Sequence, residues 1–435
     1  MAMASSYSSY QEVDLPILSE EEISCEMRER AYGICRDYLH GAWKQIAPHD
    51  MVVKQICGGL SNLLYYCALP ATHPPKSTEP SEVLLRIYGQ VHGEDALESL
   101  LTESVIFALL SERRLGPRLY GVFPGGRLEQ FIPARSLLTE ELGDRELSSL
   151  IASKMARIHA LNVPISKEPS WLWNTMEKWL KSGQELFSKK PDIDGIPEHI
   201  LDRVKKFNYR KEIDYLWKII AKVQSPVVFS HNDMQEGNIL LNTQGKTPDD
   251  RLSIIDFEYC SYNYRGFDIA NHFCEWMYEY KLPVYPYYTV ATENFPEKDK
   301  QLFFIRAYLE AYELAKRRKG VSSSGGSNED QTVSGNVLGS VPVNCNNNTI
   351  TQPSVSYSPP SHPAEDKILS EVQVFTLAAH LFWSLWSIVQ GQVSTIPFGY
   401  MEYAAVRLDH YLEGKASLRA DTFSKRKLDV ITTET

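Results

Sequence analysis

Two short apolar runs, each leading to an aspartate, place the strongest constraint on how this chain folds. Residues 227–229 and 252–255 are rich in β-branched residues and are bounded by turn formers, a pattern typical of buried strands. The first run is followed by Asp233 and, five positions later, by Asn238, and the second run is followed directly by Asp256. We therefore expect two neighbouring buried strands whose ends bring these polar side chains together.

The spacing of these residues favours phosphoryl transfer. In kinase catalytic loops, an aspartate followed five positions later by an asparagine supplies a base and a metal-binding amide, and a second strand-end aspartate binds the metal. Carboxylate and amide oxygens suit Mg²⁺, while the other carboxylate faces the accepting hydroxyl. Alternatively, Asp233 and Asn238 only cap a turn and Asp256 only ends a strand. The Asp233–Asn238 pair and Asp256 occur in this order after a glycine-rich loop earlier in the chain, and this combination favours the phosphotransfer site.

Composition limits the class of protein and its partners. The chain has 435 residues, 43% of them hydrophobic, and a formal net charge of -10. This length predicts a globular protein with a large core and two or three structural units. The negative charge disfavours nucleic acid as a partner and would attract a cationic small molecule.

Cysteine usage and hydropathy indicate a cytoplasmic protein. The seven cysteines are odd in number and include no C-x-x-C pair, so we expect reduced thiols rather than disulfides or a zinc site. The N-terminus lacks the pattern of a secretory signal. Residues 375–389 form the longest nearly apolar window, which is too short and too polar for a membrane span. We expect a buried core helix there and no stable membrane insertion.

The first third of the chain predicts an antiparallel lobe. Residues 1–19 are expected to form a flexible tail and residues 20–43 an amphipathic helix. Strands are expected at 51–56, 63–69, 83–88, 118–122 and 127–131, with a helix at 96–114. The first two strands flank Gly58 and Gly59, where backbone N–H groups can approach phosphate oxygens, although this is also ordinary hairpin chemistry.

Arg86 is a single charge within an apolar strand, so it requires a partner or a ligand. We expect an ion pair with Glu103 on the following helix, which resembles the cation–glutamate pair of kinases; a purely structural ion pair is the alternative. Residues 20–132 are therefore expected to form a nucleotide-binding lobe, and residues 129–133 to cross to the second lobe.

Residues 133–435 predict a larger, mainly helical catalytic lobe. Helices are expected at 147–159, 365–390 and 398–411, and His231 is expected to brace the catalytic turn. Residues 320–363 are rich in Ser, Gly, Asn, Thr and Pro and predict a disordered insertion. The expected fold is α+β: a two-lobed, protein-kinase-like fold with a small antiparallel-sheet N-lobe and a helical C-lobe.

Several segments together resemble one family. These are HNDMQEGNILL, IDFEYCSYNYRGFDIANHFCEWMYEY, CGGLSN, LLRIYG, RLEQFIPAR and HLFWSLWSIVQ, and they are similar to the choline and ethanolamine kinase family over residues 31–411 apart from the insertion. The resemblance implies Mg²⁺- and ATP-dependent phosphorylation of choline, and more weakly of ethanolamine, to start phosphatidylcholine synthesis. It also implies a homodimer or a heterodimer with a paralogue.

The resemblance also implies the site residues. Asp233 would be the catalytic base, and Asp256 and Asn238 would bind the metal. The nucleotide would contact Cys57, Gly58, Gly59, Leu60, Ser61, Asn62, Leu63, Arg86, Glu103, Glu129, Gln130, Phe131, Ile132, Pro133, Ala134, Arg135, Gln235 and Asp256. Some relatives have arginine where this chain has Cys57, which leaves the argument from the glycine backbone intact.

The implied acceptor site is an aromatic box. A quaternary ammonium has no N–H, so aromatic faces and a nearby carboxylate recognise it. The resemblance implies Tyr259, Glu275, Tyr280, Trp383, Trp386 and Tyr403, with Gly59, Leu60 and Ser61 also near the substrate. Trp383 and Trp386 share a helix face, as two box walls would, although tryptophans at this spacing are otherwise usually core. An ethanolamine-preferring kinase and a catalytically idle kinase-like scaffold are the alternatives.

Overall fold

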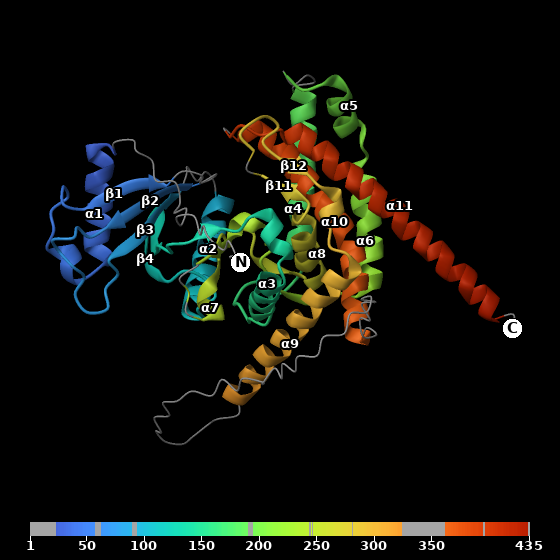
Figure 1. Cartoon of the computed structure of the whole chain (residues 1–435). Coiled ribbons are helices and arrows are strands. Elements are labelled where there is room, and N and C mark those ends of the chain that lie inside the picture. The colour runs from blue at the N-terminus through green and yellow to red at the C-terminus, as the bar shows by residue number, and fades with distance from the viewer. Residues whose placement is uncertain are drawn as a thin grey trace, which may run out of the picture.

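The structure is a computed structural model that describes residues 23–56, 62–88, 94–189, 195–242, 245, 247–280, 282–323, 362–394 and 396–433. The predicted tail, the loop residues 57–61 and residues 324–361 of the predicted insertion lie outside these ranges. The described chain forms two lobes, a smaller one built on an antiparallel sheet and a larger helical one (Figure 1). The predicted α+β, kinase-like architecture is confirmed.

The N-lobe is a five-stranded antiparallel sheet with a helix on one face. Its strand order is β1-β2-β3-β5-β4, with bounds β1 (Val52–Ile56), β2 (Asn62–Ala68), β3 (Glu82–Tyr88), β4 (Leu119–Phe123) and β5 (Gly126–Gln130). Helix α1 (Cys25–Tyr38) begins after Ser24, whose side chain caps it, and buries Ala31 and Cys35 against the sheet. Helix α2 (Glu94–Glu112) precedes β4. Strand β1 begins with alternating exposed and buried residues, whereas four of the five residues of β5 are buried.

The chain enters the C-lobe through the short strand β6 (Arg135–Ser136), which pairs with β8. The C-lobe contains three small sheets and most of the helices. Its other strands are β7 (Val227–Ser230), β8 (Ile239–Leu241), β9 (Leu252–Ile254), β10 (Ser261–Tyr264), β11 (Tyr278–Glu279) and β12 (Thr289–Val290). Its helices are α3 (Arg145–His159), α4 (Trp171–Lys189), α5 (Glu198–Lys206), α6 (Tyr209–Val223), α7 (Pro248–Arg251), α8 (Arg265–Glu275), α9 (Lys298–Ser323), α10 (Pro363–Val393) and α11 (Tyr400–Thr433).

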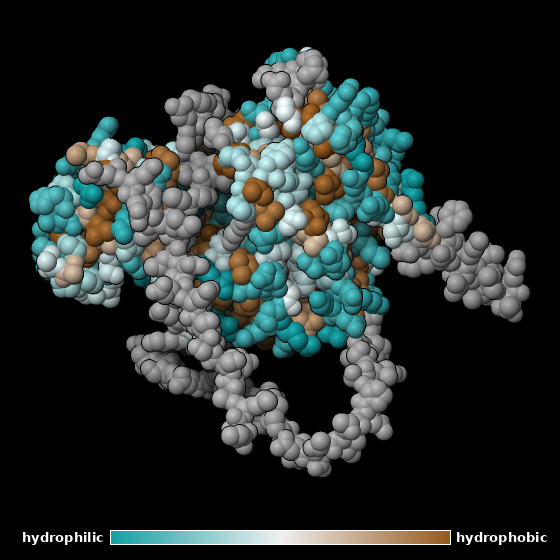
Figure 2. All heavy atoms as spheres, turned by 45° about the horizontal axis from the view of Figure 1, so that its top comes forward, coloured by the Kyte–Doolittle hydropathy of each residue, from teal (hydrophilic) through white to brown (hydrophobic). Residues whose placement is uncertain are grey.

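Helix α10 is the core of the C-lobe. It is long and apolar enough to cross a membrane by length and composition, but 78% of its most apolar window is buried inside the protein. It packs against α8, α11 and α4, as the predicted core helix would. On the face shown in Figure 2, hydrophobic residues are scattered among hydrophilic ones, in keeping with apolar side chains gathered inside.

Three predictions of the C-lobe differ from the structure. The strands that lead to Asp233 and Asp256 are not neighbours, because β7 pairs with β10 whereas β9 pairs with β8. Strand β9 pairs with β8, which is nearby in sequence and closes a smaller loop than pairing with β7 would, whereas β7 pairs with β10, which lies farther along the chain than β9. The predicted insertion is also shorter at its start, since α9 continues to Ser323. The last predicted helix continues beyond 411 to Thr433 and extends away from the lobe (Figure 1).

Candidate active site

A single cleft of about 950 Å³ lies between the two lobes and collects most of the predicted site residues. From the N-lobe and the connection it is lined by Ile56, Leu64, Leu84, Arg86, Glu129, Gln130, Phe131, Ile132, Ala134 and Arg135. From the C-lobe it is lined by Asp233, Gln235, Asn238, Asp256, Glu258, Tyr259, Glu275, Tyr280, Trp383, Trp386 and Tyr403, among others. Of the predicted contacts that are described, Leu63, Glu103 and Pro133 do not line it.

The turn that carries Asp233 is held by a buried carboxylate. Asn232 has a positive φ of 69°, a conformation that favours asparagine over most side chains. The carboxylate of Asp268, on α8, accepts the backbone N–H of Asn232 at 2.8 Å and that of His231 at 2.9 Å. His159 Nε2 also donates to Asp268 at 2.9 Å. The sequence prediction missed Asp268, although a lone charge in an apolar run was the signal used for Arg86.

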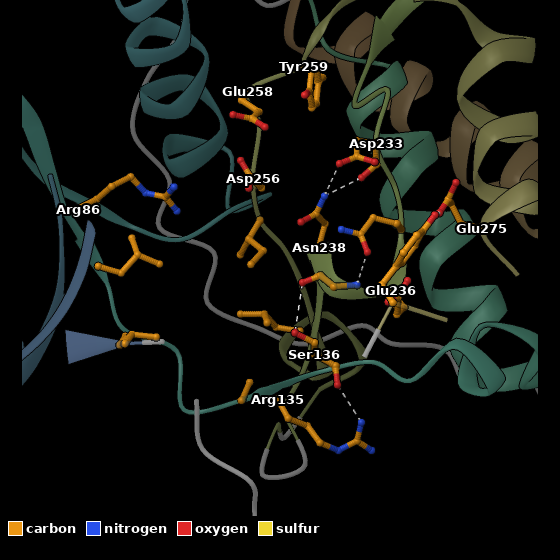
Figure 3. A pocket seen from close by; sticks show the side chains of 18 of the residues that line it. Arg86, Arg135, Ser136, Asp233, Glu236, Asn238, Asp256, Glu258, Tyr259 and Glu275 are labelled. Carbon is orange, nitrogen blue, oxygen red and sulfur yellow. Dashed lines mark hydrogen bonds between the residues drawn. The ribbon is translucent and has the colours of Figure 1, made fainter. Parts of the chain in front are cut away.

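Asp233 and Asn238 form a hydrogen-bonded pair at the floor of the cleft (Figure 3). The Asn238 side-chain amide donates to both the backbone oxygen and Oδ2 of Asp233, each at 2.9 Å. Burial raises the pKa of Asp233 well above its usual range, and the nearby carboxylates of Glu275 and Asp256 raise it further. Asn238 opposes this change by donating to the charged form.

The β8–β9 hairpin brings Asp256 to Asn238. Its register places Ile239 opposite Ile254, and the Ile255 N–H donates to the Asn238 carbonyl at 3.0 Å. Asn238, directly before the hairpin, and Asp256, two residues after it, therefore meet at its open end (Figure 3). His231 connects this hairpin to the catalytic turn, because its Nε2 donates to the Ile255 carbonyl at 3.0 Å. The predicted bracing role of His231 agrees with this contact.

These residues suit a divalent cation bound with a nucleotide. The amide nitrogen of Asn238 is used by Asp233, which leaves its amide oxygen as a ligand beside the Asp256 carboxylate. Mg²⁺ commonly binds one or two protein oxygens and completes its shell with phosphates and water. Among the described residues no cluster of His, Cys, Asp or Glu forms an all-protein metal cage. The donor set therefore fits a metal that arrives with its nucleotide.

Glu258 is a further carboxylate on this wall, to which the sequence analysis gave no role. Burial raises its pKa to about 8, and the charges of Asp256 and Glu103 act in the same direction, whereas Arg86 opposes them. Its carboxyl group faces the cleft between Asp256 and Tyr259 (Figure 3).

The predicted Arg86–Glu103 ion pair is wrong. Arg86 Nε pairs with Glu129 at 3.2 Å, and Glu103 instead pairs with Arg127 at 2.6 Å. The strand register explains the exchange, because Arg86 and Arg127 lie opposite each other on β3 and β5, and Glu129 lies two residues along on the same face as Arg127. Glu129 pairs with both arginines, and Arg127 reaches α2. The Arg86 side chain extends towards the cleft (Figure 3).

The connection between the lobes presents mostly backbone and apolar groups to the cleft. Phe131, Ile132 and Ala134 line it, as expected for a site that takes a flat heterocycle. Arg135 also lines it and forms a two-pronged ion pair with Glu141 at 2.6 and 2.7 Å. Glu129 also lines the cleft, although its carboxylate is buried between the two arginines. Within the predicted phosphate loop, residues 57–63, residues 57–61 and the side chain of Asn62 lie outside the described part of the chain.

Aromatic rings form the C-lobe end of the cleft. Trp383 lies edge-on to Tyr259 and to Trp386, with ring centroids 5.7 and 5.5 Å apart. Trp386 Nε1 donates to the Tyr259 hydroxyl at 3.1 Å. The Tyr280 and Tyr403 hydroxyls lie 2.8 Å apart on the remaining side. The structure thus brings together all five aromatic residues that the sequence placed in the box.

Glu275 completes the box, but it is not a bare charge. Its Oε1 accepts from Arg407 Nη2 at 2.6 Å, and its Oε2 accepts from the Tyr280 hydroxyl at 2.6 Å. Arg407, on α11, is fully buried, and its guanidinium lies over the Tyr278 ring at 3.8 Å. The sequence analysis did not identify Arg407, a charge that lies between the apolar residues Val406 and Leu408.

Comparisons with known proteins agree with this site. Residues 53–412 match the sequence model of the choline/ethanolamine kinase family. The chain is 43% identical to the human protein named choline/ethanolamine kinase, over 91% of this chain and 88% of that protein. It is 40% identical to choline kinase alpha of Mus musculus, over 92% of this chain and 83% of that protein.

A solved structure is similar as well. The crystal structure of choline kinase from Cryptosporidium parvum superposes with a TM-score of 0.67 and 27% identity, covering 91% of this chain and 97% of that one. The family match covers most of the chain, and its residues include the whole cleft described above. This chain belongs to the choline/ethanolamine kinase family.

Proposed function

We propose that this protein transfers the γ-phosphoryl group of ATP to the hydroxyl of choline, and less efficiently to that of ethanolamine. The observation that carries the proposal is the position of Asp233. It lies in one cleft between residues suited to Mg²⁺-ATP and an aromatic box that contains a carboxylate. The names of the relatives, choline/ethanolamine kinase and choline kinase alpha, support this assignment.

The polar residues of the cleft have separate tasks in the proposed reaction. Asp233 accepts the proton of the attacking hydroxyl, and its hydrogen bonds with Asn238 fix its orientation. Asp256 and the Asn238 amide oxygen would hold Mg²⁺, which would neutralise charge on the phosphate oxygens. Arg86 reaches into the cleft from the sheet while Glu129 fixes its Nε, which leaves its outer nitrogens for phosphate.

The aromatic box positions the acceptor. A trimethylammonium group attracts the faces of Trp383, Trp386 and Tyr259 by cation–π interaction, each worth about 0.5 to 2 kcal/mol. The acceptor hydroxyl then extends from the box towards Asp233, which lines the same cleft. Holding both reactants in this way supplies much of the rate acceleration in a reaction that needs little covalent help from the protein.

A direct assay tests the proposal. Purified protein with Mg-ATP should form phosphocholine, with a higher kcat/KM for choline than for ethanolamine. Asp233→Asn keeps the shape of the side chain but removes the base, so turnover should fall by a factor of at least about 100. The exposed ion-pair residue Asp249 supplies a matched control, because Asp249→Asn changes the same group far from the cleft. Near-normal turnover in Asp233→Asn would refute the base, and no turnover by the unaltered protein would favour an idle scaffold.

We also propose a cytoplasmic enzyme that acts as a dimer. The cysteines at described positions are free thiols, which suits a reducing compartment. The dimer rests on the family resemblance, and light scattering after size-exclusion chromatography tests it. A mass of about one chain at micromolar concentration would contradict it.

A further inference from the structure

Glu275, the carboxylate of the aromatic box, already holds a hydrogen-bond donor on each oxygen. Arg407 Nη2 donates to Oε1 and the Tyr280 hydroxyl donates to Oε2, both at 2.6 Å. The two donors approach from different sides. Arg407 is fully buried and does not line the cleft, whereas Tyr280 does. The Tyr280 hydroxyl is therefore the group that covers Glu275 on the side of the acceptor.

The protons of this network can be assigned. Burial raises the pKa of both Tyr280 and Tyr403, so both phenols keep their protons. The single Tyr280 proton goes to Glu275, because a carboxylate oxygen can only accept. In the 2.8 Å contact between the two hydroxyls, Tyr403 must then be the donor.

The phenol oxygens are occupied as acceptors as well. Tyr280 accepts from Tyr403 and from Arg407 Nη2 at 3.2 Å. Tyr403 accepts from Arg407 Nε at 2.9 Å and from its Nη2. The result is a closed network from Arg407 through the phenols to Glu275, whose members strengthen one another in a water-poor site. This corner of the box offers few free acceptors to an incoming ligand.

This arrangement treats choline and ethanolamine differently. A trimethylammonium group carries no N–H and requires no acceptor, so it loses nothing in the box. A primary ammonium carries hydrogen-bond donors that water satisfied before binding, and a buried donor without a partner costs free energy. We propose that the Tyr280 hydroxyl is a specificity-determining group, which disfavours ethanolamine by competing for the carboxylate oxygen that its ammonium would need. This inference rests on the proposed function and assigns the preference for choline over ethanolamine to the hydroxyl of one box residue.

The test uses Tyr280→Phe, which keeps the aromatic ring and removes only the hydroxyl. Acceptors with a rising number of N–H groups are compared: choline, N,N-dimethylethanolamine, N-methylethanolamine and ethanolamine. For each amine, kcat/KM is divided by the value for choline with the same protein. Tyr280→Phe should raise this ratio roughly tenfold for ethanolamine, about the effect of one hydrogen bond to a charged group. The gain should be smaller for each N–H that a methyl group replaces.

Tyr278→Phe is the matched control. The Tyr278 ring is stacked on that of Tyr280, with centroids 6.1 Å apart and planes 7° apart, but its hydroxyl bonds to His410 Nδ1 at 2.7 Å. Tyr278 does not line the cleft, so loss of its hydroxyl should leave the amine-to-choline ratios unchanged. Thermal unfolding checks that each variant is folded, and Tyr280→Leu, which also lacks the hydroxyl, replaces the Phe variant if that one does not fold.

Two outcomes would overturn the inference. One is an unchanged ethanolamine-to-choline ratio in Tyr280→Phe, and the other is an equal gain for every amine regardless of its N–H count. Either result would leave the proposed kinase activity standing if the unaltered protein phosphorylates choline. Failure of the unaltered protein to phosphorylate any of these acceptors would instead refute the proposed function itself.

Discussion

Replacing Asp268 by asparagine should damage both the stability and the chemistry of this protein. The Asp268 carboxylate is fully buried and accepts the backbone N–H groups of His231 and Asn232 as well as His159 Nε2. Burial alone would raise the pKa of Asp268, but the hydrogen bond and charge of His159 hold it below the ordinary value. The residue is therefore an ionised acceptor with its donors on both oxygens.

An asparagine cannot serve all of these donors. If the asparagine oxygen takes the position of Oδ2, it still accepts hydrogen bonds from His231 and His159. The NH₂ group then takes the position of Oδ1, which lies 2.8 Å from the Asn232 backbone nitrogen, so two donors face each other. One hydrogen bond to a charged acceptor, about 1.5 to 3 kcal/mol, is lost, and a buried donor without a partner adds about 1 to 3 kcal/mol. The expected loss is therefore about 3 to 5 kcal/mol, a large part of a typical stability of about 5 to 15 kcal/mol.

Urea denaturation and steady-state kinetics measure the two effects. Because Asn232 directly precedes Asp233, loosening the turn should displace the base and lower kcat by a factor on the order of 100. Asp202→Asn makes the same change in an exposed ion pair with Lys206, at a side chain that is 48% exposed, and should cost less than about 1 kcal/mol. A loss below about 1 kcal/mol in Asp268→Asn, with kcat within twofold, would refute the reasoning.

Further predictions follow from the other buried groups. Arg127→Met leaves the buried carboxylate of Glu129 and the half-buried carboxylate of Glu103 without their shared cation and should cost about 3 to 5 kcal/mol in urea denaturation, whereas a neutral result would mean that solvent reaches them. Trp386→Ala should raise KM for choline roughly tenfold and KM for ATP less than twofold, and equal increases would mark a core residue instead. Burial lowers the pKa of His272 to about 4. The unfolded chain binds this proton with an ordinary pKa of about 6.5, so the neutral His272 stabilises the folded state fully above about pH 6.5. As the pH falls from there towards 4, the free energy of unfolding should decrease by roughly 3 kcal/mol. His272→Gln should make that decline shallower in pH-dependent unfolding, and an identical slope would contradict the assignment.

The parts of the site that the sequence predicted are encoded locally. Asp233 and Asn238 lie five residues apart at the end of one strand, and Asp256 follows directly on another, so short-range pattern alone located them. Trp383 and Trp386 were predicted from the family resemblance, and their helical spacing agrees with a shared face. Local spacing was sufficient even though β7 and β9 proved to lie in different sheets.

The contacts that the sequence did not predict depend on long-range geometry. The choice between Glu103 and Glu129 as the partner of Arg86 is set by the register of β3 against β5, which no single stretch of residues specifies. Asp268 and Arg407 act on residues that are distant in the chain, so their partners emerge only when α8 and α11 dock. In both cases a charge within an apolar run showed that a partner exists, without showing which one.

Helix α10 limits how acceptor preference can evolve in this protein. Trp383 forms a wall of the box, yet it also packs edge-on against Phe382 and donates to Asn271 at 2.6 Å inside the core. A substitution there would trade selectivity against folding. Tyr280 directly follows the short edge strand β11, where a change disturbs less of the interior. We expect natural variants with new amine preferences to differ around β11 and to retain the tryptophans of α10.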